Sequence, residues 1–406
     1  MLNFNDTVRA FAYKSNKQIV KATRLFSLMN VAPLVKLGTV LTPLALKWKL
    51  PVKGLIRSTL FEQFVGGESL EQSSPVIDML EKHHVDVILD YGVEGGEYNE
   101  EKYDHALEEF LKVIRFASTK KNAPFISVKL TGLTSFALLQ KLNLSSYKTY
   151  EFITDEKMNE KLNSLFAHEK NAWQKLIQRT TKICETAQNL GVGVMIDAEE
   201  SWIQDPIDYV ALMMSRIFNT NNPVVYNTIQ FYRHDRMQFM KDAHGDSIDK
   251  KYRFAIKIVR GAYMEKERAR AAELDYPSPI HIDKKSVDAD YNEAIQFCLG
   301  ASNPVSLIVA SHNEESTLLA VEYSTKIGRN PNDHNTLHFS QLYGMSDNIT
   351  FNLAAEGFSV SKYLPFGPIH EVIPYLMRRA QENSSVSGQT NRELMLLRRE
   401  SRRRCI

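Results

Sequence analysis

The chain has 406 residues, of which 43% are hydrophobic and 24% are charged, and this composition excludes a disordered, collagen-like or coiled-coil protein. The formal net charge of +2 provides no global field for nucleic acid or an acidic membrane, so a charged ligand must be bound locally. Cys184, Cys298 and Cys405 are too few and too scattered for a disulfide framework and share no metal-ligand spacing. We therefore expect a reducing compartment.

The N-terminal region is basic and mildly amphipathic over residues 1–30, without the apolar core or cleavage site of a secretory signal. We interpret it as helices, with a mitochondrial transit peptide as the alternative. The most apolar run covers residues 31–50, but Lys36 and Pro43 interrupt it, and it falls short of the ~20 clean residues of a membrane span. We expect a helix packed on the body or a surface that touches a membrane interface. Residues 1–70 are thus predicted to form an N-terminal helical segment.

After this segment the sequence alternates between short apolar runs and longer stretches with helical periodicity. The runs are nearly continuous in apolar residues, as expected for parallel strands covered on both faces. Strands are predicted at 85–92, 125–133, 192–201, 224–232, 254–263, 306–313, 337–345 and 360–367. Helices are predicted between them, for example at 99–118, 289–300 and 313–328. Eight repeats of strand and helix predict an α/β fold, a (β/α)8 barrel over residues 71–385, in preference to a doubly wound sheet.

Polar residues gather near the carboxyl ends of the predicted strands, the end at which barrel active sites assemble. They are Lys129, Asp197, Glu199, Glu200, Gln230, Arg260, His312, Gln341 and Tyr363. Two segments depart from a minimal barrel. An insertion at 144–176 is expected to add helices between the second and third strands, and residues 386–406 are expected to form a basic C-terminal tail, a solvated end of the chain.

The densest motif is KYLPFGPIHEVIPYLMRRAQEN at 362–383, where a strand is followed by a helix. Arg378 and Arg379 are adjacent on that helix, and Glu382 lies within side-chain reach of either. Because guanidinium groups offer planar paired donors and stay charged, the two arginines suit an external carboxylate. The alternative is a surface ion-pair cluster.

A second cluster, IKIVRGAYMEKER at 256–268, ends a strand with Lys257 and Arg260 beside Gly261 and Ala262. The small residues leave room for a ligand near the backbone, and the cations favour a phosphate or an electron-rich ring system. A packing role explains this motif equally well.

Three carboxylates fall within four residues in IDAEESW at 196–202. Such a group could bind a metal or act as acid and base, and we favour pairing with neighbouring cations. His334 and His338 have i,i+4 spacing but precede and enter a strand, which disfavours a zinc site. No dinucleotide-binding or P-loop glycine motif occurs.

Together these motifs resemble the proline dehydrogenase family, FAD-dependent barrel enzymes of proline catabolism. The resemblance covers roughly residues 60–385 and rests on segments that occur in the family's order. They are FEQFVGGES (61–69), IDAEES, TIQFYRHD (228–235), IKIVRGAY, ASHN (310–313), FSQLYGM (339–345) and the motif at 362–383.

The resemblance implies a role for each matched position. Arg378 and Arg379 would bind the proline carboxylate with help from Lys129, while Glu382 would orient the arginines. The residues around the pyrrolidine ring would be Tyr263, Leu342 and Tyr363, the last of which favours proline because its bulk crowds a 4-hydroxyl group. FAD would be held by Gln230, Lys257, Arg260, Gly261, Ala262, Tyr263, Ser311 and His312. Asp197 and Ala198 match the strand that meets the flavin, and Asp197, Lys257 and Arg260 are the expected catalytic group.

The resemblance further implies that a hydride passes from proline C5 to flavin N5, giving 1-pyrroline-5-carboxylate, and that electrons then pass to a quinone. Residues 31–50 and the basic tail are candidate surfaces for peripheral membrane contact. A separate 1-pyrroline-5-carboxylate dehydrogenase is expected for the next oxidation, because little chain follows the barrel. We expect a cytoplasmic protein at the inner membrane, with the mitochondrial matrix as the alternative.

Two other functions remain open from the residues. A barrel aldolase would use Lys129 or Lys257 to form a Schiff base with a carbonyl substrate. A degenerate barrel could instead bind proline or FAD as a non-catalytic sensor, although the intact Arg378, Arg379 and Tyr363 argue against it.

Overall fold

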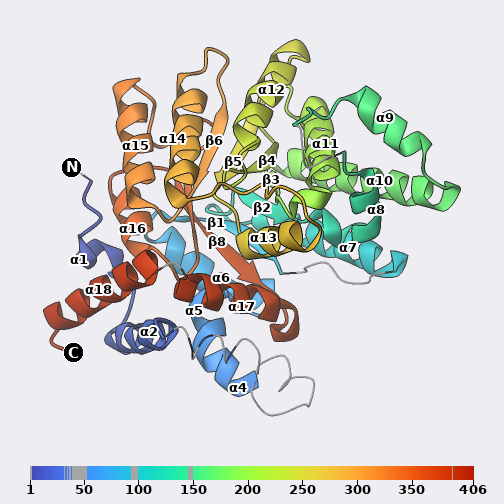
Figure 1. Cartoon of the computed structure of the whole chain (residues 1–406). Helices are drawn as coiled ribbons and strands as arrows, with labels where there is room; N and C mark the ends of the chain where they lie inside the picture. The colour runs from blue at the N-terminus through green and yellow to red at the C-terminus, as the bar shows by residue number, and fades with distance from the viewer. Residues whose placement is uncertain are drawn as a thin grey trace. The chain divides into compact units, whose positions relative to one another are not determined.

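The computed structural model describes residues 2–31, 53–92, 99–144, 150–385 and 387–406, together with positions 33, 35 and 38. Eight parallel strands form a sheet that closes in the order β1 to β8 into a barrel. Figure 1 shows these strands with their helices. Their bounds are Asp86–Tyr91 (β1), Phe125–Val128 (β2), Gly193–Ile196 (β3), Val225–Gln230 (β4), Ala255–Val259 (β5), Ser306–Ala310 (β6), Leu337–Leu342 (β7) and Val360–Phe366 (β8).

Each strand lies within the range predicted from its apolar run, and the predicted barrel is confirmed. The strands are buried along most of their length because helices cover one face and side chains fill the barrel on the other. The pairing places Thr228, Lys257 and Ile308 side by side on β4, β5 and β6. Lys257 therefore lies in the buried part of β5, and only 4% of this residue is exposed.

Contacts divide the chain into two units, Met1–Val93 with Ser340–Ile406 and Glu94–Phe339. The second unit carries β2 to β6, the first half of β7 and the helices between them. These helices are α7 (Glu100–Ala117), α8 (Phe136–Leu142), α9 (Asp155–Asn163), α10 (Ala167–Leu190), α11 (Ser201–Phe218), α12 (Arg236–Asp249), α13 (Met264–Glu273), α14 (Lys284–Gly300) and α15 (Glu314–Lys326). A single 3₁₀ turn, η2 (Leu130–Gly132), follows β2.

Local signals explain where several helices of this unit begin. Asn99, Asp283 and Asn313 cap α7, α14 and α15 by accepting a hydrogen bond from a backbone N–H in the first turn. These starts confirm the helices predicted at 99–118, 289–300 and 313–328, the second of which begins five residues earlier than expected. Within the predicted insertion, α9 is an additional helix, while residues 145–149 lie outside the described part of the chain.

The first unit contains β1, the end of β7, β8 and the terminal helices. Its helices are α1 (Thr7–Ala10), α2 (Asn16–Met29), α4 (Lys53–Ile56), a π-helical turn η1 (Arg57–Phe61), α5 (Glu62–Phe64), α6 (Leu70–Glu81), α16 (Asp347–Ala355), α17 (Ile369–Ser385) and α18 (Ser387–Arg403). One apolar cluster joins them, with Phe26 of α2, Phe64 of α5, Leu376 of α17 and Leu397 of α18 all buried. Most of the apolar run at 31–50 lies outside the described residues.

The C-terminal segment 386–406 differs from the expected solvated tail. It forms α18, on which Leu394, Leu396 and Leu397 are buried while the arginines on the opposite side are exposed. The segment is therefore an amphipathic helix packed on its own unit. In the part of the chain that is described, no helix combines the length and apolar character needed to cross a membrane.

Candidate functional site

A buried cluster of two lysines and one aspartate lies at the carboxyl ends of β2, β3 and β5. Asp197 directly follows β3, and its carboxylate accepts a hydrogen bond of 2.5 Å from Lys257 Nζ. The other carboxylate oxygen lies 3.7 Å from Lys129 Nζ, and Lys129 directly follows β2. Because Asp197 and Lys257 are 8% and 4% exposed, their charges interact with little screening by water. Two ammonium groups and one carboxylate leave a local excess of positive charge.

A second buried carboxylate fixes the turn that follows Lys129. Glu199 accepts hydrogen bonds from the Thr131 backbone N–H at 3.2 Å and from Thr131 Oγ1 at 2.6 Å. Thr131 belongs to η2, the 3₁₀ turn for which Lys129 is the preceding cap residue. Burial raises the pKa of Glu199 to about 7, against the lowering effect of the Thr131 hydroxyl. The carboxylate therefore joins the β2 and β3 loops beside the lysine.

The remaining acid of the IDAEES motif has a cation as its partner. Glu200 pairs with Lys266 of α13, and the next residue, Ser201, donates from its N–H and hydroxyl to Glu267 at 2.7 and 2.6 Å. Burial raises the pKa of Glu267. Asp197 and Glu200 thus pair with cations as predicted, whereas the partner of Glu199 is a threonine.

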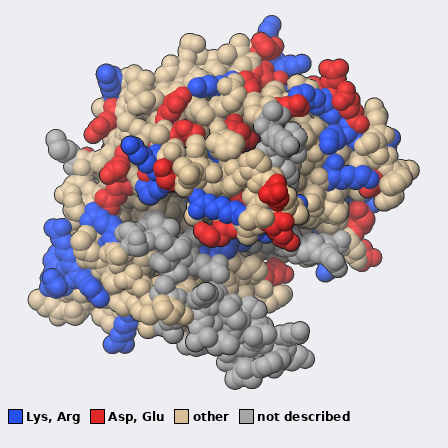
Figure 2. Space-filling model, in the orientation of Figure 1, with Lys and Arg blue, Asp and Glu red and all other residues tan. Residues whose placement is uncertain are grey.

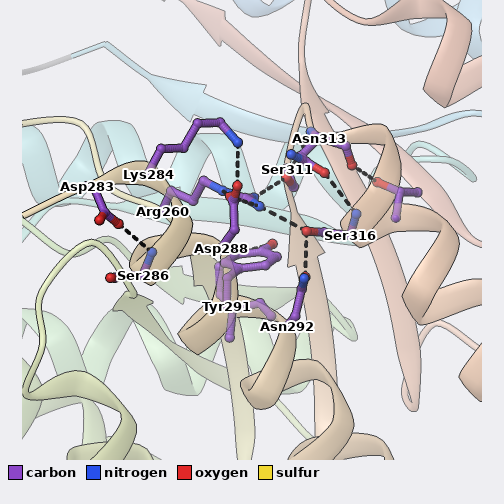
Figure 3. A network of polar contacts seen from close by, with 12 residues as sticks. Arg260, Asp283, Lys284, Ser286, Asp288, Tyr291, Asn292, Ser311, Asn313 and Ser316 are labelled. Atoms are coloured by element: carbon purple, nitrogen blue, oxygen red, sulfur yellow. Dashed lines mark hydrogen bonds and ion pairs between the residues drawn. The ribbon is translucent and has the colours of Figure 1, made fainter. Parts of the chain in front are cut away.

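Arg260, just after β5, lies at the centre of a second polar network (Figure 3). Its guanidinium donates to Asp288 at 2.8 Å, to Ser311 Oγ at 2.8 Å and to Ser316 Oγ at 2.9 Å. The guanidinium carbon also lies 4.3 Å from the centre of the Tyr291 ring. Contacts from α14, α15 and the end of β6 therefore fix the orientation of the guanidinium. A flexible surface arginine would have no such fixed orientation.

The backbone after Arg260 is adapted to a close approach. Gly261 has φ of +138°, and a Cβ atom there would lie 2.5 Å from the ring of Tyr232, so only glycine fits. Gly261 and Ala262 are exposed, and Tyr263 is partly exposed. The neighbouring β4 ends at Gln230, which is 3% exposed, and β6 is followed by Ser311 and His312. The carboxyl ends of β4, β5 and β6 thus present amide, guanidinium, hydroxyl and imidazole groups around small residues.

Sequence reasoning missed the residues that hold Arg260. Asp288 and Tyr291 have the i,i+3 spacing of one helix face, and Asn292 completes the same face with a contact of 2.6 Å to Ser316. Three residues with polar groups on the same helix face as the buried Ile295 are the signal that could have revealed them. Thr131, the partner of Glu199, carried no comparable signal.

The first unit holds the other predicted substrate residues. Tyr363 lies within β8 and is partly exposed, and Leu342 ends β7. On α17, Arg378 is partly exposed and Arg379 is 7% exposed, with its guanidinium carbon 5.3 Å from the centre of the Tyr375 ring. Glu382 belongs to the same helix, but its side chain lies outside the described part of the chain.

The two histidines weighed as zinc ligands pack on an aromatic ring. His334 and His338 each meet Phe125 edge-on, with ring centroids 6.0 and 5.2 Å away. His338 is fully buried at the amino end of β7, and burial lowers its pKa to about 3. A neutral imidazole in an aromatic cluster is the role that these contacts indicate.

Comparisons with known proteins agree with this architecture. The family model described as proline dehydrogenase matches residues 74–392. The chain is 31% identical over 355 residues to the carbapenem antibiotics biosynthesis protein CarD of Pectobacterium carotovorum subsp. carotovorum, covering 87% of each chain. It is 30% identical over 435 residues to the mitochondrial proline dehydrogenase 1 of Arabidopsis thaliana, covering 100% of this chain and 87% of the plant protein.

A solved structure shares the fold. Proline utilization A from Bdellovibrio bacteriovorus, inactivated by N-propargylglycine, matches with a TM-score of 0.68 at 19% identity. The match covers 93% of this chain and 38% of that longer protein. A family model over most of the barrel and relatives matched along most of their length lead to one conclusion: the chain belongs to the proline dehydrogenase family, enzymes that oxidise proline.

Proposed function

We propose that the protein catalyses the FAD-dependent oxidation of L-proline to 1-pyrroline-5-carboxylate and passes the electrons to a quinone. The observation that carries the proposal is the buried Lys129–Asp197–Lys257 cluster in a barrel of this family. A cluster with excess positive charge suits an anionic substrate and an electron-accepting ring. Proline carries the carboxylate that such a site would bind.

The donors at the ends of β4, β5 and β6 fit FAD. Arg260 is fixed by three partners, the exposed backbone at Gly261 and Ala262 leaves room for a flat ring or a phosphate, and Gln230, Ser311 and His312 add hydrogen-bonding groups. We infer that these residues, with Ala198, Lys257 and Tyr263, hold the cofactor. When bound, FAD supplies the two-electron redox chemistry, accepting at N5 the hydride from proline C5, and the protein supplies orientation and electrostatics.

The substrate residues are assigned by the motif at 362–383 and by Lys129. Arg378 and Arg379 bind the carboxylate with Lys129, and Glu382 orients the arginines. The pyrrolidine ring packs against Tyr263, Leu342 and Tyr363. Binding energy at the carboxylate thereby positions C5, a carbon without charge of its own.

Asp197 has an orienting role in this proposal. Its two oxygens face Lys257 and Lys129, so one carboxylate sets the positions of both cations. Arg260, held by Asp288, Ser311 and Ser316, completes the catalytic group and would contribute a positive charge to the flavin site. The bound amine must lose a proton before the hydride leaves, and the positive charge of Lys129 and Lys257 favours the neutral amine.

The same ion pair weighs against an aldolase. A Schiff base requires a lysine amine that is free to attack a carbonyl, and Lys257 Nζ donates instead to the buried Asp197 carboxylate at 2.5 Å. The proposed product is passed to a separate 1-pyrroline-5-carboxylate dehydrogenase. We place the enzyme in the cytoplasm at the inner membrane. The alternative is the mitochondrial matrix, because several relatives are named as mitochondrial.

Proline-dependent reduction of an artificial electron acceptor tests the proposal. The FAD-loaded protein should reduce the dye with L-proline and much more slowly with 4-hydroxyproline, because Tyr363 crowds the 4-position. N-propargylglycine, which inactivates the Bdellovibrio enzyme, should cause a time-dependent loss of the activity. A protein that binds FAD and proline but shows no proline-dependent dye reduction would contradict the proposal and favour a sensor.

A further inference from the structure

A buried ion pair joins β8 to α16 in the first unit. Lys362 of β8 and Asp347, the first residue of α16, are each 1% exposed. Lys362 Nζ lies 2.9 Å from Asp347 Oδ1 and donates to the Met345 carbonyl at 2.6 Å. Burial would raise the pKa of Asp347, but the charges of Lys362 and Lys14 outweigh burial and hold the pKa below its usual value. The pair is therefore ionised, and neither residue has a role in the proposed binding of proline or FAD.

Segments near both ends of the chain reach this ion pair. Tyr13 donates its hydroxyl to Asp347 Oδ2 at 2.7 Å, and Lys14 Nζ lies 3.5 Å from the same oxygen. Glu393 of α18 accepts a hydrogen bond of 3.0 Å from the N–H of Ser346, the residue before α16. Figure 2 shows blue side chains over α18 at the left of the molecule, whereas Glu393 is only 7% exposed. The terminal helices thus provide side chains to the junction between β7 and α16.

The loop at this junction, residues 343–346, has a fixed and unusual conformation. Ser346 has φ of +51°, a left-handed conformation that residues other than glycine rarely adopt. Gly344 has φ of +79°, and a Cβ atom there would lie 2.0 Å from the Gln63 carbonyl oxygen, so only glycine fits. Gln63 Nε2 also donates to the Gly344 carbonyl at 2.7 Å. Contacts from α5, α18 and β8 therefore determine the course of this loop.

The same loop is connected to two residues that we assign to the pyrrolidine ring. Leu342 ends β7 immediately before the loop, and the Tyr343 N–H donates to the Tyr363 carbonyl at 2.9 Å. Lys362 directly precedes Tyr363 on β8. Because successive side chains of a strand point to opposite faces, Lys362 reaches α16 on one face while Tyr363 points to the other. A movement of the loop would therefore change the positions of Leu342 and Tyr363.

We propose that Lys362 and Asp347 are positioning residues for the substrate site. Their ion pair fixes the loop at 343–346, and the loop holds Leu342 and Tyr363 where they admit proline and exclude 4-hydroxyproline. A buried ion pair often stabilises a fold no better than apolar side chains of the same volume, so stability alone does not account for it. A hydrogen-bonded ion pair does have a defined geometry, which apolar contacts lack. The inference deepens the proposed function and rests on it.

The double variant Lys362→Met/Asp347→Asn, made in the full chain and loaded with FAD, tests the positioning role. It removes both charges but nearly keeps both side-chain shapes, so the melting temperature and the affinity for FAD should stay near those of the wild type. The proline KM should rise about tenfold with a smaller change in kcat, because the ring is packed less well. The ratio of kcat/KM for proline to that for 4-hydroxyproline should fall about tenfold.

A matched control removes an ion pair from the other unit. Arg216, near the end of α11, and Asp246 of α12 are paired at 2.7 Å and are largely shielded from water. The variant Arg216→Met/Asp246→Asn should keep the wild-type proline KM and the wild-type ratio.

Wild-type kinetics in the double variant would overturn the positioning role, and so would equal losses in the double variant and the control. Should the double variant fail to fold, Tyr13→Phe provides the test, because it removes one hydrogen bond to Asp347 and keeps the ring that stacks on Phe351. This variant should raise the proline KM about threefold and lower the ratio, and unchanged values would overturn the proposal. A wild-type protein that reduces no dye with proline would instead refute the proposed function, on which the positioning role rests.

Discussion

Replacing His338 by phenylalanine should make the free energy of unfolding less dependent on pH in the acid range, because one titrating group is removed. His338 is fully buried, and neither ring nitrogen has a hydrogen-bond partner in the described part of the chain. Burial, and then the nearby His334, lowers its pKa from 6.5 to about 3. Below about pH 6.5 His338 therefore binds a proton in the unfolded chain but not in the folded chain. As a result, the free energy of unfolding decreases as the pH falls from 6.5 to 3.

The magnitude follows from the size of this shift. Each pKa unit corresponds to about 1.36 kcal/mol, so the complete effect approaches roughly 5 kcal/mol at the acid end of the window. Between pH 7.5 and pH 5.0, the unfolded histidine becomes protonated and the cost is about 2 kcal/mol. Phenylalanine is slightly larger than histidine, but any packing strain is independent of pH and cancels when two pH values are compared.

Urea unfolding followed by tryptophan fluorescence at pH 7.5 and 5.0 measures this difference. From the higher to the lower pH, the wild-type protein should lose about 2 kcal/mol more free energy of unfolding than H338F. His105, which is exposed on α7, provides the control, and H105F should keep the wild-type pH dependence. An H338F variant with the same pH dependence as wild type would refute the reasoning, because it would show that His338 accepts a proton in the folded state.

Three further predictions concern the site. Arg260→Lys keeps the charge but loses the planar group that contacts Asp288, Ser311 and Ser316. The affinity for FAD, measured by fluorescence titration, should therefore fall about tenfold or more. Unchanged affinity would contradict the assignment of Arg260 to the cofactor site. Thr131→Val removes the 2.6 Å hydroxyl contact to Glu199 and should raise the proline KM by up to about tenfold, with a smaller change in kcat. Thr131→Ser keeps the hydroxyl and should have kinetics near those of the wild type. Equal effects of the two substitutions would argue against a role for this contact. Arg378→Met should raise the proline KM strongly while FAD stays bound, and loss of FAD from this variant would overturn the substrate role of Arg378.

The barrel could be predicted because its strands are buried on both faces. Continuous apolar runs marked all eight strands, and their order along the chain determined the parallel topology. The predicted strands were too long at their carboxyl ends, by five residues at β2 and β3. There the chain leaves the ladder: after β2 it turns into η2, and after β3 it reaches α11 within four residues, while Lys129 and Asp197 lie close enough to pair.

Two features could not be predicted for physical reasons. The run of charged residues near position 400 was interpreted as a solvated tail, but it belongs to an amphipathic helix. Only the packing shows that Glu400 is buried against Arg403 and Arg404 and that Leu396 and Leu397 face the core. The partners of Arg260 lie 28 to 56 residues away in sequence and are joined to it only by the fold. Long-range polar contacts of this kind leave no periodic pattern in a single sequence.

The central claim is that proline reduces a flavin held by this barrel, and an absorbance spectrum tests it most directly. The purified FAD-loaded protein is recorded between about 300 and 550 nm before and after anaerobic addition of L-proline. The account predicts flavin bands that bleach with proline and persist with the same concentration of 4-hydroxyproline. Flavin bands that proline leaves unchanged, or a protein that cannot be loaded with FAD, would contradict it.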